Sequence, residues 1–303
     1  MLAAMTESTE ARRERAARRA GEFPPAPEAL PLPVIDSHTH LDITVSEAGV
    51  PGGAPGGASA DDPVARMIAM AADVGVNRLV QVGVDLPSSQ WGAELAARNG
   101  AVVATVALHP NEAPRLSDLD EALRSIEALA AQERVRGIGE TGMDFFRTGE
   151  DGRAAQEASF RAHIAIAKRY GKPLIIHDRD AHAEVLRILD DEGAPETVVL
   201  HCFSGDAEFA TECVGRGYLL SFAGTVTFGS AAALREAARV TPPELILVET
   251  DAPYLTPTPY RGRPNASYLI PLTVRALAET TGTGVAELCA AISDNGERVF
   301  GPW

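Results

Sequence analysis

The chain has 303 residues, a hydrophobic fraction of 45% and a formal net charge of −15. The composition is that of a globular protein, and the excess of acidic residues counts against broad adsorption onto nucleic acid, which needs many Lys and Arg contacts with phosphate. No run approaches the ~18 apolar residues of a membrane span, and the N-terminus lacks the apolar core of a secretory signal, so the sequence predicts neither.

At the N-terminus, residues 1–33 are rich in Ala, Arg, Glu and Pro, with five arginines between positions 12 and 19. This composition is typical of a solvated segment, and we predict a disordered or weakly ordered arm there. An arm that binds nucleic acid is the alternative use of the basic cluster. We expect a single domain over residues 34–303.

From residue 34 onward, short apolar runs alternate with longer segments rich in Ala, Leu, Glu and Arg. The eight expected strands lie within residues 33–40, 78–84, 102–110, 135–142, 172–178, 197–203, 218–224 and 245–253. Helices are expected between them, for example over residues 62–75, 89–100, 117–133, 157–171 and 183–193. Nearly continuous apolar strands separated by helices indicate a parallel sheet that is covered on both faces.

Eight such units favour an α/β fold of the closed (β/α)8 TIM-barrel class. The alternative, an open doubly wound sheet, lacks the GxGxxG motif that would follow its first strand. One segment departs from the alternation, because residues 49–62 read GVPGGAPGGASADD. This low-complexity stretch predicts a flexible loop after the first strand, which is either a neutral insertion or a mobile flap over the site.

Polar residues stand where the expected strands end. In a TIM barrel the C-terminal ends of the strands meet at the face that carries the active site. Six candidates stand at such ends: His38, His40, Glu140, His177, His201 and Asp251. His38 and His40 are two residues apart on one strand, so their side chains point the same way.

This residue set predicts a metal centre. Imidazole and carboxylate together suit zinc, manganese, iron or nickel, and magnesium less well. Four histidines and two carboxylates exceed the needs of one tetrahedral ion, and they suit two divalent ions (Mg, Mn or Zn) about 3.5–4 Å apart that share a carboxylate. Three other histidines are left out of the set: His109 is interpreted as a hydrogen-bonded core residue, and His163 and His182 fall in helical segments.

Six motifs stand in the order IDSHTHLD, GIGETGMDFF, IIHDRDA, LHCFSG, ETDAPYL and RGRPN. They resemble those of the TatD family of metal-dependent deoxyribonucleases, which are amidohydrolase-like barrels, and the resemblance runs from residue 34 to residue 300. It implies that His38 and His40 hold one metal with Asp251, that Glu140 bridges, and that the second metal is held by His177 and His201. The loop over residues 49–62 and the arm over residues 1–33 depart from the family pattern.

The hypothesis that follows is hydrolysis of a phosphodiester by a water that two metal ions activate, with a DNA or oligonucleotide 3′ end as the substrate that the family implies. Asp251 would serve as ligand and proton acceptor, and Glu140 as the bridging carboxylate. Arg179, Arg261 and Arg263 are expected to bind phosphate oxygens, with surface ion pairs as their alternative role.

Four aromatic residues are expected near the mouth, either to stack a base or to pack under loops: Phe145, Phe146, Phe203 and Tyr254. The same barrel and metals would also suit an amide or ester hydrolase, such as an aminoacyl-tRNA deacylase, because metal-activated water attacks carbon as well as phosphorus. A non-catalytic metal-binding scaffold would be expected to have lost ligands, and none is missing.

The cysteines bear on location. Cys202, Cys213 and Cys289 are odd in number and show no CxxC spacing, which argues against a disulfide framework or a zinc–thiolate site. A cytoplasmic, reducing setting is therefore expected. The sequence predicts no membrane partner and leaves the oligomeric state open.

Overall fold

The computed structural model describes residues 21–51 and 62–303, and its centre is an eight-stranded parallel sheet in which the strands neighbour one another in chain order. The strands are β1 (Val34–Thr39), β2 (Val76–Val82), β3 (Val102–Val106), β4 (Val135–Asp144), β5 (Leu174–Arg179), β6 (Val198–Leu200), β7 (Leu219–Phe222) and β8 (Ile246–Val248). All eight coincide with expected strands. β1 and β3 are buried along their whole length, which explains the apolar character of β3 and of the first two residues of β1, Val34 and Ile35.

The sheet closes on itself between its first and last strands. Just beyond β8, Asp251 N donates to His38 O at 2.9 Å and His40 N donates to Ala252 O at 3.0 Å, and Thr39 forms a parallel bridge with Ala252. These contacts confirm the TIM barrel and exclude the open doubly wound sheet.

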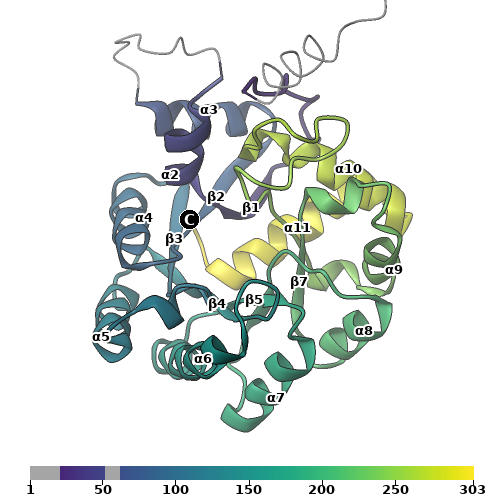
Figure 1. Cartoon of the computed structure of the whole chain (residues 1–303). Coiled ribbons are helices and arrows are strands. Elements are labelled where there is room, and N and C mark those ends of the chain that lie inside the picture. The colour runs from purple at the N-terminus through teal and green to yellow at the C-terminus, as the bar shows by residue number, and fades with distance from the viewer. Residues whose placement is uncertain (1–20, 52–61) are drawn as a thin grey trace, which may run out of the picture.

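Helices surround the strands as a ring (Figure 1). The longer ones are α3 (Pro63–Asp73), α4 (Leu86–Arg98), α5 (Leu119–Ala130), α6 (Glu150–Tyr170), α7 (His182–Glu192), α8 (Ala207–Gly215), α9 (Ala232–Val240), α10 (Ile270–Thr281) and α11 (Val285–Phe300). Local sequence sets several of their starts. Asp62 accepts a hydrogen bond from Val64 N at the start of α3, and Asp85 and Ser88 form a capping box at the start of α4.

Two short elements follow β1 directly, α2 (Leu41–Ile43) and the π-helical turn η1 (Thr44–Ala48). They lead towards the predicted flap, most of which, residues 52–61, lies outside the described residues. None of the described helices combines the length and the apolar character that crossing a membrane requires.

The α11 helix packs directly on the barrel strands. A Cβ added at Gly296 would lie 2.8 Å from Ile35 Cγ2, so only glycine allows α11 to approach β1 this closely. The adjacent Asn295 Nδ2 donates to the backbone oxygens of Pro243 and Ile246, at 2.8 Å each, which joins the helix to the start of β8.

The predicted arm is only partly described, since residues 1–20 lie outside the described residues. Residues 21–33 form neither helix nor strand and lie against the barrel. Arg263 Nε donates to Glu22 O and Tyr268 Oη to Pro24 O, both at 2.6 Å, and Leu30 is buried. The prediction of a weakly ordered arm did not anticipate these contacts, and the domain boundary at residue 33 stays a prediction.

Candidate metal centre

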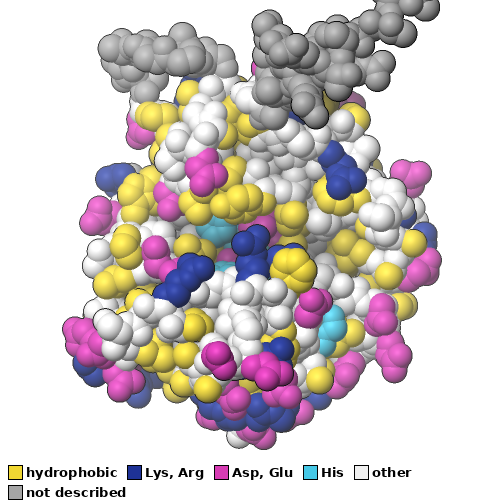
Figure 2. Space-filling model, in the orientation of Figure 1, with side chains coloured by type: hydrophobic (Ala, Val, Ile, Leu, Met, Phe, Trp, Pro, Cys, Tyr) yellow, Lys and Arg dark blue, Asp and Glu magenta, His cyan; other side chains and the backbone are white. Residues whose placement is uncertain are grey.

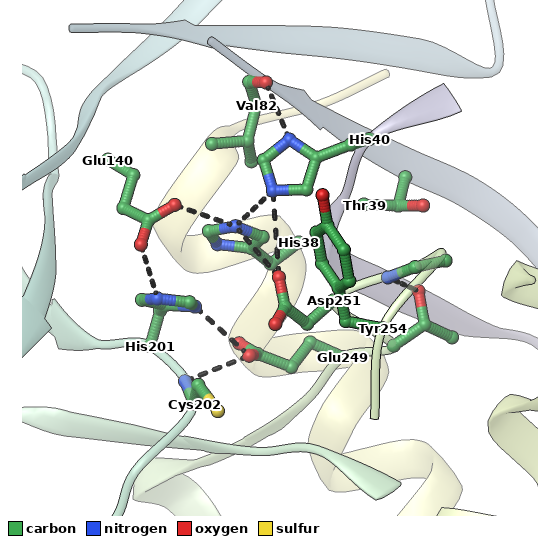
Figure 3. Close-up of polar contacts among 12 residues, drawn as sticks. His38, Thr39, His40, Val82, Glu140, His201, Cys202, Glu249, Asp251 and Tyr254 are labelled. Carbon is green, nitrogen blue, oxygen red and sulfur yellow. Dashed lines mark hydrogen bonds and ion pairs between the residues drawn. The ribbon is translucent and has the colours of Figure 1, made fainter. Parts of the chain in front are cut away.

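All six predicted metal-binding side chains meet at the C-terminal mouth of the barrel. They come from the ends of β1, β4, β5, β6 and β8, and Figure 3 shows five of them pointing toward one another. The four that are fully enclosed are His38, His40, Glu140 and His201. The clustering follows from the fold, because the C-terminal ends of all eight strands share one face.

The glycines on either side of Glu140 explain how its carboxylate reaches the centre. Gly142 has φ +137°, and a Cβ there would lie 2.1 Å from His177 O. A Cβ at Gly139, with φ +155°, would lie 2.5 Å from Ile175 O. β4 therefore approaches β5 more closely than side chains allow, and the two glycines make room for the bend that aims Glu140 inward.

Glu140 lies between four imidazoles. Its Oε1 is 2.6 Å from His177 Nδ1, 2.8 Å from His201 Nε2 and 3.2 Å from His109 Nε2. Its Oε2 is 3.4 Å from His38 Nε2. Burial acts to raise the pKa of Glu140, but His201 and His109 outweigh it and hold that pKa well below its usual range. The carboxylate is therefore ionised and able to bind a cation.

A second group of donors faces the first from β1 and β8. His38 Nε2 and His40 Nε2 lie 3.3 Å apart, and Asp251 Oδ1 is 3.8 Å and 3.5 Å from them. Asp251 has φ +52°, a left-handed conformation that is uncommon outside glycine and that its backbone bond to His38 fixes. His40 Nδ1 lies 3.1 Å from Val82 O, which fixes the tautomer that leaves Nε2 free to bind a metal.

Two buried carboxylates that the sequence interpretation missed orient the histidines from behind. Glu249 Oε1 lies 3.1 Å from His201 Nδ1 and accepts a hydrogen bond from Cys202 N at 2.8 Å (Figure 3). Asp144 Oδ2 lies 3.2 Å from His177 Nε2. A signal was available, because Glu249 stands two residues before Asp251 and Asp144 stands four residues after Glu140, and an even spacing along an extended chain places side chains on the same side.

His109 also belongs to this centre. Together with Glu140 and His177 it forms one of three groups, among residues 21–51 and 62–303, whose possible ligand atoms all lie within 4.8 Å of one another. The other two groups are His38, His40 and Asp251, and His38, His201 and Glu249. The prediction left His109 out because a proline follows it, but its position at the end of β3 was the same signal that selected the other histidines.

The metal centre forms the floor of a cleft of about 1240 Å³. Figure 2 shows a hollow on this face with histidine inside it and Lys or Arg side chains at its edge. Of the three predicted phosphate-binding arginines, the structure places Arg179 on the cleft wall. Arg263 instead donates to backbone oxygens of residues 22 and 23, and Arg261 lies over the ring of Phe228 at 4.0 Å. Arg115 and Arg147, which were not predicted, line the cleft.

Known proteins resemble this chain over most of its length. Residues 35–301 match the family described as TatD related DNase. A Mycobacterium tuberculosis protein described as an uncharacterized metal-dependent hydrolase, TatD, is 45% identical over 272 residues, which cover 88% of this chain and 98% of that protein. The 3′-5′ ssDNA/RNA exonuclease TatD of Citrobacter rodentium is 36% identical over 249 residues, 80% and 91% of the two chains. The crystal structure of the TatD homolog YjjV from Escherichia coli superposes with a TM-score of 0.79 at 25% identity, and the match covers 88% of this chain and 97% of that one.

Proposed function

The chain belongs to the TatD related DNase family of metal-dependent hydrolases, and from this premise we propose that it removes nucleotides from the 3′ end of single-stranded DNA with two divalent metal ions. The observation that carries the proposal is the position of the buried Glu140 carboxylate between two groups of histidines. A relative at 36% identity is named as a 3′-5′ exonuclease for single-stranded DNA and RNA, which supports the choice of substrate and polarity.

The donor set fits two cations. Nitrogen and oxygen atoms from six side chains converge at separations of 2.6–3.8 Å, and the facing Nε2 atoms of His38 and His40 are typical of a metal-binding pair. We propose that His38, His40 and Asp251 hold one ion, and that His177 and His201 hold the other with Glu140 as the shared ligand. This mixture of imidazole and carboxylate favours manganese or zinc over magnesium.

When bound, the ions supply Lewis acidity, which lowers the pKa of water and offsets charge on the attacked phosphate. Burial acts to raise the pKa of Asp251, but the bond to His40 and the nearby histidines have the larger effect. The net result is a pKa below the ordinary value, so the carboxylate is ionised. We propose that it accepts the proton of the attacking water. Arg179, on the cleft wall, would donate to the non-bridging phosphate oxygens.

The test is cleavage of a labelled single-stranded oligonucleotide by the purified protein, first with excess chelator and then with Mn²⁺, Zn²⁺ or Mg²⁺ restored. We expect no cleavage in chelator, recovery with a divalent ion, and protection by a blocked 3′ end but not by a blocked 5′ end. Asp251→Asn should abolish turnover. Undiminished cleavage in chelator would contradict the metal mechanism, and turnover of aminoacyl-tRNA or simple esters without cleavage of the oligonucleotide would replace the nuclease with an ester hydrolase.

Two arginine variants give a matched comparison for phosphate binding. Arg179→Gln removes a guanidinium from the cleft wall, whereas Arg261→Gln removes one that lies on Phe228 away from the cleft lining. We expect Arg179→Gln to raise KM for the oligonucleotide and Arg261→Gln to leave it unchanged. We also propose a cytoplasmic location, which the three free cysteines support.

A further inference from the structure

The rim of the cleft carries an aromatic side chain that the proposed chemistry does not use. Phe146 is 63% exposed, more than any other large hydrophobic side chain among the described residues. It stands two residues after the end of β4, between Asp144, which contacts His177, and Arg147, which lines the cleft. Its backbone is therefore fixed beside the metal centre while its ring faces solvent.

The ring has one fixed partner. The guanidinium carbon of Arg179 lies 3.9 Å from the centroid of Phe146, a cation–π contact between the loop after β4 and the end of β5. Because one face of the ring is under this guanidinium, an exposed fraction of 63% requires the other face to be open. The pair therefore presents a flat aromatic surface, and the contact with Arg179 on the opposite face of the ring fixes its orientation.

The cations beside this ring are available for phosphate. Within residues 21–51 and 62–303, neither Arg179 nor Arg147 forms an ion pair, although both line the cleft. Arg115, the third arginine of the lining, pairs with Glu112 at 2.6 Å. An open aromatic face in contact with Arg179, at a cleft that Arg147 also lines, is the combination that single-stranded nucleic acid binds, because bases stack while phosphates are neutralised.

The size of the cleft indicates a polymer rather than one small ligand. Its volume of about 1240 Å³ exceeds the ~300–1,000 Å³ of pockets that enclose a single drug-sized molecule. Tyr254, which is 47% exposed, also lines it three residues after Asp251. A terminal nucleotide over the metal centre therefore leaves room for the next nucleotide at the rim.

We propose that Phe146, held in place by Arg179, is the stacking platform for the penultimate nucleobase, on the 5′ side of the phosphodiester that is cleaved. Arg147 and Arg179 contact the phosphates on either side of that base. This inference rests on the proposed exonuclease function and makes Phe146 a residue that determines specificity for oligonucleotides over small phosphodiesters. One stacked base corresponds to a factor of roughly 5 to 150 in kcat/KM.

The experiment pairs changes in the enzyme with changes in the substrate. Wild type, Phe146→Ala and Phe146→Trp are assayed with divalent metal on two single-stranded oligonucleotides that differ only in an abasic site at the penultimate position. A small chromogenic phosphodiester, bis(p-nitrophenyl) phosphate, is the third substrate. Val240→Ala, at an exposed apolar side chain at the end of α9, is the matched control.

We expect wild type to lose about 10-fold in kcat/KM on the abasic oligonucleotide. Phe146→Ala should lose a similar factor on the normal oligonucleotide and should no longer distinguish the two. Phe146→Trp should keep the distinction, and all four proteins should hydrolyse the small phosphodiester at the same rate.

The inference fails if Phe146→Ala distinguishes the abasic oligonucleotide as strongly as wild type does. It also fails if Phe146→Ala slows the small phosphodiester equally, since the ring would then support the fold of the site. Absence of oligonucleotide cleavage by wild type overturns the proposed function itself, and the two failures are thereby distinguished.

Discussion

A buried histidine outside the metal centre supports the segment after β3 that carries His109. His163, in the middle of α6, lies 2.7 Å from Ser159 O through Nδ1, and its Nε2 accepts a hydrogen bond from Leu108 N at 3.1 Å. The two bonds require a neutral ring with its proton on Nδ1, since Nε2 must accept. Burial lowers the pKa of His163 from its ordinary value of 6.5 to about 4. Protonation of this ring therefore opposes folding.

The sign and size of the effect follow from the two pKa values. The unfolded chain takes up the proton near pH 6.5 and the folded chain only near pH 4. The contribution of His163 to the free energy of unfolding is therefore fully present above about pH 6.5 and is lost as the pH falls toward 4. At about 1.4 kcal/mol for each pH unit, the free energy of unfolding falls by about 2 kcal/mol at pH 5 and by about 3 kcal/mol at pH 4.

The assay is urea unfolding of wild type and His163→Gln in excess chelator, at about pH 7.5 and about pH 5. Glutamine can donate to Ser159 O and accept from Leu108 N, but it does not titrate. We expect the variant to be the less stable protein at the higher pH. The difference in free energy of unfolding between wild type and variant should shift by about 2 kcal/mol in favour of the variant at the lower pH. Contributions of the other titrating groups are shared by both proteins and cancel. A difference in free energy of unfolding that is the same at both pH values would refute the reasoning.

Three further predictions concern the support of the metal centre. Glu249→Ala should weaken metal binding about 10- to 100-fold by calorimetry, because His201 Nδ1 loses its partner. Glu249→Gln should keep most of the affinity. Equal affinities for Glu249→Ala and wild type would exclude the orienting role. Gly142→Ala should cost about 1–3 kcal/mol of stability and also reduce metal affinity, since its Cβ meets the His177 carbonyl; retention of full affinity would argue against β4 bending as the cause of the Glu140 position. Gly296→Ala should cost a similar free energy through its contact with Ile35 but leave metal affinity unchanged, and a loss of affinity there would show that stability alone controls the site.

The barrel was predictable because its evidence is local. Strands buried on both faces are mostly apolar, and β3 reads VVATV in the sequence. β1 begins as an apolar run, Val34 and Ile35, and then turns polar towards His38. The ligand positions were predictable for a related reason, since polar residues that end such runs must face the same end of the barrel. The starts of helices were predicted less well, and α6 begins at Glu150 rather than at residue 157.

The residues that support the ligands were not predicted, because their roles depend on contacts between distant strands. Glu249 is identified as a supporting residue only when β6 brings His201 within 3.1 Å of it. The loops were the least predictable part. Arg261 and Arg263 stand in one motif, yet Arg263 turns to the segment before β1 because free carbonyl groups there accept its hydrogen bonds. Hydrophobic periodicity does not predict the direction in which a loop side chain points.

The charge of the cleft reconciles an acidic protein with an anionic substrate. Five carboxylates and three guanidinium groups line the cleft, so its lining repels phosphate when no metal ion is bound. The net charge of −15 on the whole chain acts in the same direction. Two divalent ions would reverse the sign of the cleft while leaving the rest of the surface negative. Within the part of the chain that the structure describes, attraction is then centred on the cleft, where Arg147 and Arg179 lie on the wall. A substrate held in this way inserts its end, and this physical constraint favours an exonuclease over an enzyme that binds along a duplex.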